Sequence, residues 1–271
     1  MTGITCSGDH ACRGSTADGR HKSCEAGSAG TRRQHGESWE HAAGVDHNPM
    51  YALVVAGGAI DAAERALVKR ASLVVAADSG AEFLRQHNLT PDMIVGDFDS
   101  ASPDTIACFR GMGISIFSLN RDKDKTDTEV ALDLVTGKGF DAVIIIGGTR
   151  GRRLDHELAN VFLIEHYARK GLDLILHSQD TVIFGIPGGE VQYGNRRRMQ
   201  KRVFTGKPGD WVTILPVTPQ VTGATTVNLK FPLSNATLYR GSTLGVSNEM
   251  LNTEASVSLK SGFALVVLNR R

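Results

Sequence analysis

Between residue 51 and about residue 180, short apolar runs alternate with stretches in which apolar residues recur at helical spacing. The apolar runs predict strands at 51–56, 73–77, 93–95, 114–117, 142–146 and 173–177. The stretches between them predict helices near 61–70, 79–87, 103–110, 127–136 and 155–169. Strands that alternate with helices form a parallel sheet covered on both faces. The pattern therefore predicts an N-terminal α/β domain, which we place at residues 50–180.

The pattern changes after residue 181 to short alternating runs separated by turn residues. Clear examples are 211–215, 237–239 and 264–268. This rhythm is typical of a small all-β domain, and we predict a β-sandwich over residues 181–271.

Residues 1–49 differ from both parts, since they hold few large apolar residues among many Gly, Ser, Arg and His. Such a segment buries too little surface to offset its ordering entropy, so we predict a disordered tail. Met50 directly precedes the first predicted strand. It is therefore a candidate for the natural start of the protein, with the tail as an upstream-start artefact.

Composition excludes several classes of function. The formal net charge is +1, and 41% of the 271 residues are hydrophobic, so neither nucleic acid nor membrane is indicated as a partner. No apolar run approaches the roughly 20 residues that span a bilayer, and the N-terminus lacks the apolar core of a secretion signal. The four cysteines show no paired zinc spacing. We expect reduced thiols and a cytoplasmic location.

Two carboxylates follow the strand predicted at 93–95. Asp97 and Asp99 are two residues apart, so in extended backbone they point to the same side and can share one ion. Ligands of an open parallel sheet bind beyond the carboxyl ends of its strands, and Mg²⁺ prefers oxygen ligands shared with substrate phosphates. The alternative is a polar loop in which the aspartates cap turns.

A second charged loop lies at residues 123–127, which read Lys-Asp-Lys-Thr-Asp. Binding of Mg²⁺ and phosphate needs both signs of charge, which favours a functional role for Asp127. A structural role is equally open, because Thr126 and Glu129 have the spacing of a capping box and an acidic residue in a first turn is favoured by the helix dipole.

A glycine- and arginine-rich segment at 147–156 joins a predicted strand to a predicted helix. Gly147 and Gly148 let the backbone approach a ligand, the helix N-terminus attracts phosphate, and arginines donate to phosphate oxygens. The alternative is a simple strand-to-helix turn with Asp155 as N-cap. One face of the following helix is apolar, with Leu158, Val161 and Phe162.

Taken in order, five motifs resemble those of bacterial thiamine pyrophosphokinases, and the resemblance covers residues 51–268. The motifs lie at 77–81, 91–100, 124–129, 153–160 and 245–249. The resemblance implies an α/β ATP-binding domain followed by a β-sandwich that binds thiamine, working as a homodimer. It also implies Mg²⁺-dependent transfer of pyrophosphate from ATP to the thiamine hydroxyl, giving AMP and thiamine diphosphate.

The motifs carry site residues over by position. Asp97, Asp99 and Asp127 match the acidic positions that hold Mg²⁺ and the triphosphate, and one of Asp99 and Asp127 is expected to accept the hydroxyl proton. The expected ATP and thiamine contacts come from the remaining motifs and the glycine-rich segment: Asp78, Gly147, Gly148, Arg153, Asp155, His156, Ser247 and Asn248.

The sequence departs from the pattern of the family at three places. Ser79 and Arg152 stand where glycine is usual, and Val227-Asn228 stands where Lys-Gly is common. None of these removes a carboxylate. Two other functions remain open: a pyrophosphokinase for another heteroaromatic alcohol such as a pterin, and a catalytically silent regulator that binds ATP or thiamine.

Overall fold

The structure of the protein is a computed structural model that describes residues 50–189, 192–193, 196–197 and 201–271. The predictions of a disordered tail and of a start at Met50 concern residues 1–49, which lie outside the described part of the chain.

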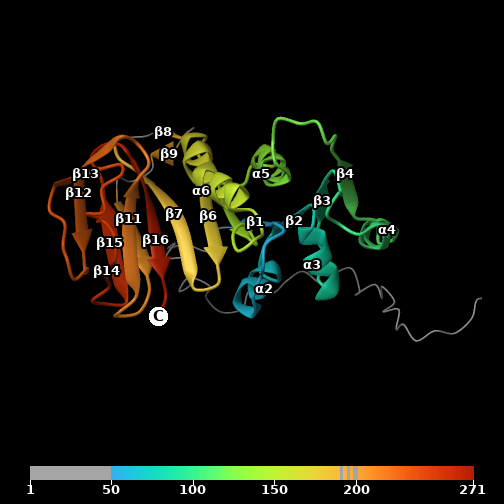
Figure 1. The fold of residues 1–271 in the computed structure, drawn as a ribbon, viewed down its shortest axis with the longest axis horizontal. Helices are drawn as coiled ribbons and strands as arrows, with labels where there is room; N and C mark the ends of the chain where they lie inside the picture. Colours follow the sequence, from blue (N-terminus) through green and yellow to red (C-terminus); the bar gives the residue numbers. More distant parts are fainter. Residues whose placement is uncertain (1–49, 190–191, 194–195, 198–200) are drawn as a thin grey trace, which may run out of the picture. The chain divides into compact units, whose positions relative to one another are not determined.

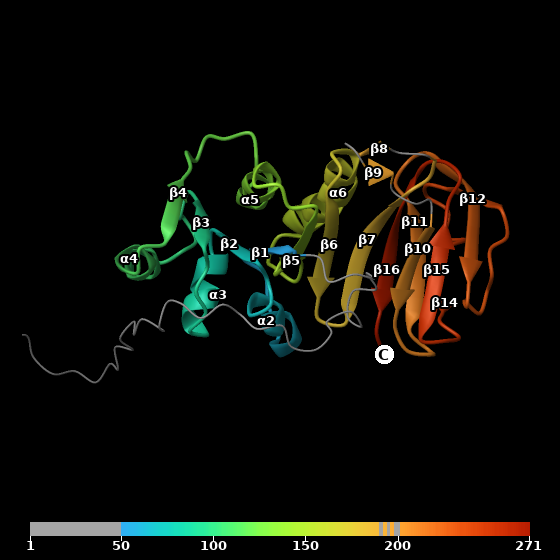
Figure 2. The same cartoon turned by 180° about the vertical axis from the view of Figure 1, so that it is seen from behind.

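A ten-stranded sheet runs through the described residues in the order β14-β11-β16-β7-β6-β5-β1-β2-β3-β4 (Figures 1 and 2). Its first six strands in the sequence pair in parallel. Their bounds are Ala52–Val55 for β1, Leu73–Ala77 for β2, Met93–Gly96 for β3, Ser115–Ser118 for β4, Ala142–Ile146 for β5 and Asp173–Ser178 for β6. All six lie where the apolar runs predicted them.

Five helices connect these strands: α2 (Ala62–Val68), α3 (Gly80–Gln86), α4 (Pro103–Gly111), α5 (Asp127–Gly137) and α6 (Leu154–Arg169). Asp61 and Glu64 form a reciprocal capping box at the start of α2. Thr126 caps α5 by accepting a hydrogen bond from the amide of Glu129. The N-cap of α6 is Arg153, so the alternative that made Asp155 the cap is wrong.

The helices cover both faces of the parallel part of the sheet, as predicted. Leu67 of α2, Leu84 of α3 and Phe109 of α4 belong to one apolar cluster. Leu132 of α5 and Tyr167 of α6 belong to the other. Because successive residues of β1 to β3 point to opposite faces, every strand contributes to both clusters.

The rest of the chain is antiparallel β structure. β7 (Thr181–Pro187), β16 (Phe263–Asn269), β11 (Trp211–Pro216) and β14 (Asn248–Glu249) extend the large sheet. β10 (Lys201–Thr205), β15 (Glu254–Ser258), β12 (Gln220–Val227) and β13 (Ala236–Tyr239) form a second sheet, and β8 (Gln192–Tyr193) pairs with β9 (Arg196–Arg197). Inner residues of the two larger sheets, such as Phe184 and Phe204, share one core, which confirms the predicted sandwich.

The predicted division at residue 180 falls in the turn between β6 and β7. These strands pair with each other, so both parts contribute strands to one continuous sheet. Among the helices of the described residues, none combines the length and apolar character that a membrane span requires.

Candidate active site

The strand order reverses beside β1, which lies between β5 on one side and β2 on the other. In an open parallel sheet such a switch point leaves a crevice at the carboxyl ends of the strands. A cavity of about 840 Å³ opens there. Its walls come from the segments after β1, β2, β3 and β5, from the loop before α5 and from the first turns of α5 and α6. The switch point thus gathers loops that are far apart in the sequence.

Three carboxylates meet on one side of this cavity. Asp78 follows β2, Asp97 and Asp99 follow β3, and one oxygen from each lies within 4.8 Å of the others. Asp78 and the intervening Phe98 have φ of +45° and +59°, which is unusual for residues with a side chain and is often found at functional sites. Burial raises the pKa of Asp78, and its Oδ1 atom is buried without a hydrogen-bond partner.

Lys123 lies between two of the predicted acidic residues. Its ammonium is 2.6 Å from Oδ2 of Asp97 and 3.1 Å from Oδ1 of Asp127. The hydrogen bond from Lys123 lowers the pKa of Asp97. Burial opposes the charge of Lys123, but the bonds to Asp97 and Asp127 outweigh it, so the pKa of Lys123 is raised. The two carboxylates are therefore held by an internal cation.

Asp127 is the first residue of α5 and lines the same cavity. Burial raises its pKa, while Lys123 acts in the opposite direction. Asp127 does not belong to the group of three oxygens formed by Asp78, Asp97 and Asp99. Thr126 therefore caps the helix, as the structural alternative expected, and Asp127 faces the cavity, so its functional role stays a prediction.

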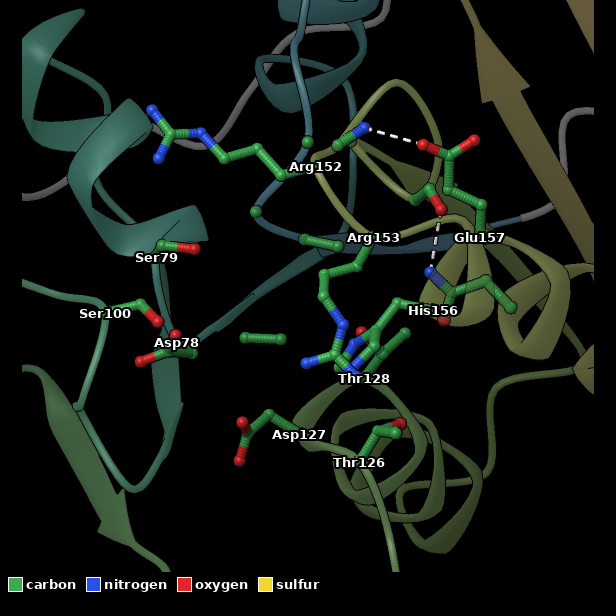
Figure 3. A pocket seen from close by; sticks show the side chains of 18 of the residues that line it. Asp78, Ser79, Ser100, Thr126, Asp127, Thr128, Arg152, Arg153, His156 and Glu157 are labelled. Carbon is green, nitrogen blue, oxygen red and sulfur yellow. Dashed lines mark hydrogen bonds between the residues drawn. The ribbon is translucent and has the colours of Figure 1, made fainter.

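The glycine-rich segment forms the opposite wall. Gly147 has φ of +65°, and a Cβ atom there would lie 2.5 Å from the carbonyl oxygen of Ala56, so only glycine fits. Two side chains of α6 hold the segment. The amide of Asn160 donates to the carbonyl of Gly148 at 2.7 Å. Glu157, labelled in Figure 3, accepts from the amide of Gly151 at 2.8 Å.

Arg152, Arg153 and His156 also line the cavity. In the view of Figure 3 the two guanidinium groups diverge, with Arg153 directed to the centre and Arg152 to the side of Ser79. Arg153 donates to both oxygens of Asp155, which lowers the pKa of Asp155 to about 2. Asp155 is exposed and does not itself line the cavity.

Ser247 and Asn248 lie elsewhere, in the β part, and do not line this cavity. Asn248 is buried, and its side chain donates to the carbonyl of Phe231 at 2.6 Å and accepts from the amide of Phe231 at 2.9 Å. That pairing fixes the backbone near β14. Ser247 has φ of +58° and donates its amide hydrogen to Thr213 Oγ1.

The structure thus brings most of the predicted site residues to one cavity: Asp78, Asp97, Asp99, Asp127, Gly147, Gly148, Arg153 and His156. Three residues that we did not single out as site residues also belong to it or support it. Lys123 was visible only as part of a charged loop, whereas Glu157 and Asn160 lay within the motif at 153–160 but were given no role of their own. Their roles follow from distances across the fold, which sequence spacing does not give.

Both the α/β part and the β part of the chain match models of known protein families. Residues 65–176 match the family model described as thiamin pyrophosphokinase, catalytic domain, and residues 199–264 match the one described as thiamin pyrophosphokinase, vitamin B1 binding domain. The chain belongs to the thiamine pyrophosphokinase family. Among the described residues, those that line the cavity lie before residue 161, so the candidate site falls in the part that contains the catalytic match.

Individual thiamine pyrophosphokinases are similar over most of the chain. The thiamine pyrophosphokinase of Bacillus subtilis is 26% identical to this chain over 196 residues, which are 72% of this chain and 86% of that protein. Thiamine pyrophosphokinase 1 of Oryza sativa is 25% identical over 223 residues, 75% of this chain and 81% of that protein. The crystal structure of the Bacillus subtilis enzyme covers 82% of this chain and 99% of its own, with a TM-score of 0.71 at 23% identity, and so supports the fold.

Proposed function

We propose that the protein transfers pyrophosphate from ATP to the hydroxyl group of thiamine, with release of AMP. The observation that carries this proposal is the arrangement of the cavity, which has oxygen donors on one wall and glycines with arginines on the other. A triphosphate with a bound cation needs both walls. Family membership supplies thiamine as the acceptor alcohol.

The donor set suits Mg²⁺. Asp78, Asp97 and Asp99 offer only oxygen atoms, within the reach of one ion, and Asp78 Oδ1 is buried without a partner. Mg²⁺ prefers such oxygen ligands and commonly shares them with substrate phosphates. When bound, it would neutralise charge on the phosphate oxygens. The structure favours Asp78 as a ligand together with Asp97 and Asp99, whereas the sequence placed Asp127 in that set.

The reaction joins the hydroxyl oxygen of thiamine to the β-phosphorus of ATP and breaks the bond between that phosphorus and the oxygen of the α-phosphate. AMP leaves, and the hydroxyl proton is released. Such transfers depend mainly on positioning and charge neutralisation. The backbone at Gly147 and Gly148 would bind the phosphates, and Arg153 would stabilise charge that develops in the transition state.

Asp127 is the carboxylate best suited to receive the hydroxyl proton. Burial raises its pKa, whereas hydrogen bonding lowers that of Asp97. A carboxylate with a raised pKa is the stronger base. Asp127 lies outside the group of three carboxylates and pairs with Lys123 through Oδ1, so we expect its other oxygen to face the acceptor substrate.

We also propose that the protein works as a homodimer in which the β-sandwich of one copy completes the thiamine site of the other. Of the sandwich residues that the structure describes, none lines the cavity of its own chain. Of the apolar face predicted for α6, Leu158 and Phe162 are exposed, by 49% and 58%, whereas Val161 packs against the core; Leu154 of the same helix is also exposed, by 68%. An exposed apolar stripe beside the cavity indicates an interaction surface. Sedimentation should show a dimer, and an active monomer would contradict the proposal.

Product analysis tests the function. With ATP, Mg²⁺ and thiamine we expect thiamine diphosphate and AMP in equal amounts, and no turnover when a hydroxymethyl pterin replaces thiamine. Turnover of the pterin alone would support the alternative acceptor. Nucleotide binding without turnover would support the silent regulator. The comparisons support neither alternative, and every predicted carboxylate is present. The cytoplasmic location remains a prediction, which cell fractionation would test.

A further inference from the structure

Arg150 occupies a position whose backbone favours glycine. Its φ is +60°, a left-handed conformation that is unfavourable for a residue with a side chain. It lies in the glycine-rich segment, three residues after Gly147. Strain of this kind persists only where surrounding contacts compensate it. The contacts of the Arg150 side chain are therefore informative.

The guanidinium group of Arg150 is bound by the protein itself. Its Nη2 atom donates to the carbonyl of Ala59 at 2.7 Å, and its Nη1 atom donates to Oε1 of Gln179 at 2.6 Å. Nη2 also lies 3.5 Å from Oε2 of Glu64. Although Arg150 lines the cavity, these acceptors direct its N–H groups toward the fold and away from a substrate.

Glu64 is an unusual partner because its side chain is completely buried in α2. Its Oε2 atom accepts the amide hydrogen of Asp61 in the capping box, at 2.8 Å, and its Oε1 atom has no hydrogen-bond partner. Glu64 does not line the cavity. A buried carboxylate needs a compensating charge, and Arg150 is the cation that contacts it.

Three loops meet at Arg150. Ala59 belongs to the loop after β1, Gln179 belongs to the turn between β6 and β7, and Arg150 itself follows β5. The backbones of the loop after β1 and the loop after β5 are in direct contact, since the amide of Gly58 donates to the carbonyl of Gly147 at 2.7 Å. A Cβ atom at Gly58 would lie 2.2 Å from the carbonyl oxygen of Thr149, so the loops pack without side chains between them.

We propose that Arg150 is a positioning residue, which clamps the segment 147–153 to the loop after β1 and to the β6–β7 turn and thereby holds it in the shape that binds nucleotide phosphates. Glu64 anchors this clamp from outside the cavity. The inference rests on the proposed function only in assigning the segment to nucleotide binding. A direct ligand of the phosphates would instead keep its N–H groups free for the substrate.

The experiment compares wild type, Arg150→Met, Glu64→Gln and the double variant. Glutamine preserves the volume of Glu64 and can still serve in a capping box. Hydrogen exchange of the ligand-free proteins reports on segments 57–60 and 147–153, and calorimetry with α,β-methylene-ATP and Mg²⁺ reports on nucleotide binding. Arg70→Met is the matched control, because Arg70 is an exposed arginine just after α2, the helix that carries Glu64.

We expect faster exchange of both segments and roughly tenfold weaker nucleotide binding in Arg150→Met, as for loss of charged hydrogen bonds. Glu64→Gln should also speed exchange and weaken nucleotide binding. The effects of the two substitutions in the double variant should be less than additive. Arg150→Gly removes the clamp and relieves the left-handed strain, and it should also bind weakly. Arg70→Met should match wild type.

Two results would overturn the clamp. One is unchanged exchange in Arg150→Met together with weaker nucleotide binding and no effect of Glu64→Gln, which would make Arg150 a direct phosphate ligand. The other is wild-type affinity and exchange in Arg150→Gly. If the wild-type protein bound nucleotide but did not convert thiamine, the proposed function would fail while the clamp could still stand. If it bound no nucleotide, the clamp would fail as well.

Discussion

The ammonium of Lys123 lies 2.6 Å from Asp97, between the carboxylates that follow β3 and the start of α5. It joins two segments that are separated by 26 residues in the sequence. The contact lowers the pKa of Asp97 and so keeps this carboxylate ionised. An internal cation therefore sets the charge of the site before any substrate enters.

Replacement of Lys123 by methionine should lower kcat by about 10²-fold, because a preorganised charge in an active site has an effect of that size. Steady-state kinetics at saturating ATP and thiamine would measure it. Lys125→Met is the matched control, since Lys125 is more exposed and pairs with Asp133 and Glu129 instead. Equal losses in both variants would show that only the net charge of the loop matters.

Asp97→Asn should also lower kcat by at least about 10²-fold while the thermal unfolding midpoint stays close to that of wild type. The substitution preserves size and removes only the charge that faces the cavity. Asp104→Asn, at an exposed position of α4, should retain full turnover. Unchanged turnover of the Asp97 variant at saturating Mg²⁺ would remove Asp97 from the site.

Substitutions of Asp78 and Asp127 should have different effects on metal binding. Mn²⁺ binding to the nucleotide-free protein, followed by calorimetry, should weaken about tenfold in Asp78→Asn, which is roughly 1.4 kcal/mol. Asp127→Asn should retain Mn²⁺ binding and lose turnover, because Asp127 lies outside the group of three oxygens. The opposite pattern would restore the metal ligands that the sequence suggested.

Much of this site was accessible from the sequence, for reasons that particular residues make clear. Asp97 and Asp99 follow a buried strand, and the edge of a parallel sheet is where such residues meet. Gly147 could be read because only glycine tolerates its backbone and its approach to Ala56. The positions of β1, β2, β3, β5 and β6 were predictable because these strands are buried and mostly apolar, whereas β4 is largely exposed.

Other features could not be predicted because they depend on distances across the fold. The charged loop at 123–127 did not reveal that Lys123 would bridge Asp97 and Asp127. The apolar spacing of Leu158 and Phe162 indicated a helix face but not that this face is exposed. Asn248 matched a motif, yet its side chain holds the backbone of Phe231.

His177 provides a test of the fold that is independent of the reaction. It is 5% exposed in β6, its Nδ1 atom lacks a hydrogen-bond partner, and burial lowers its pKa to about 4 from 6.5. Below pH 6.5 the unfolded chain therefore binds a proton that the folded protein excludes. The free energy of unfolding should fall by up to roughly 3 kcal/mol between pH 6.5 and pH 4.

Chemical denaturation at a series of pH values would measure this loss. His177→Leu should lack that part of the pH dependence, because no imidazole remains to be protonated. His87→Gln, at an exposed position just after α3, should keep it. A His177 variant with the same pH dependence as wild type would show that His177 is not buried in the neutral form.

Transfer of label from ATP that carries ³²P at its β-phosphorus tests the central claim most directly. The reaction is run with Mg²⁺ and thiamine, and the products are separated. Attack at the β-phosphorus predicts that all the label appears in thiamine diphosphate, with one unlabelled AMP formed for each. Label retained in ADP, together with formation of thiamine monophosphate, would show transfer of the γ-phosphate and would contradict the account.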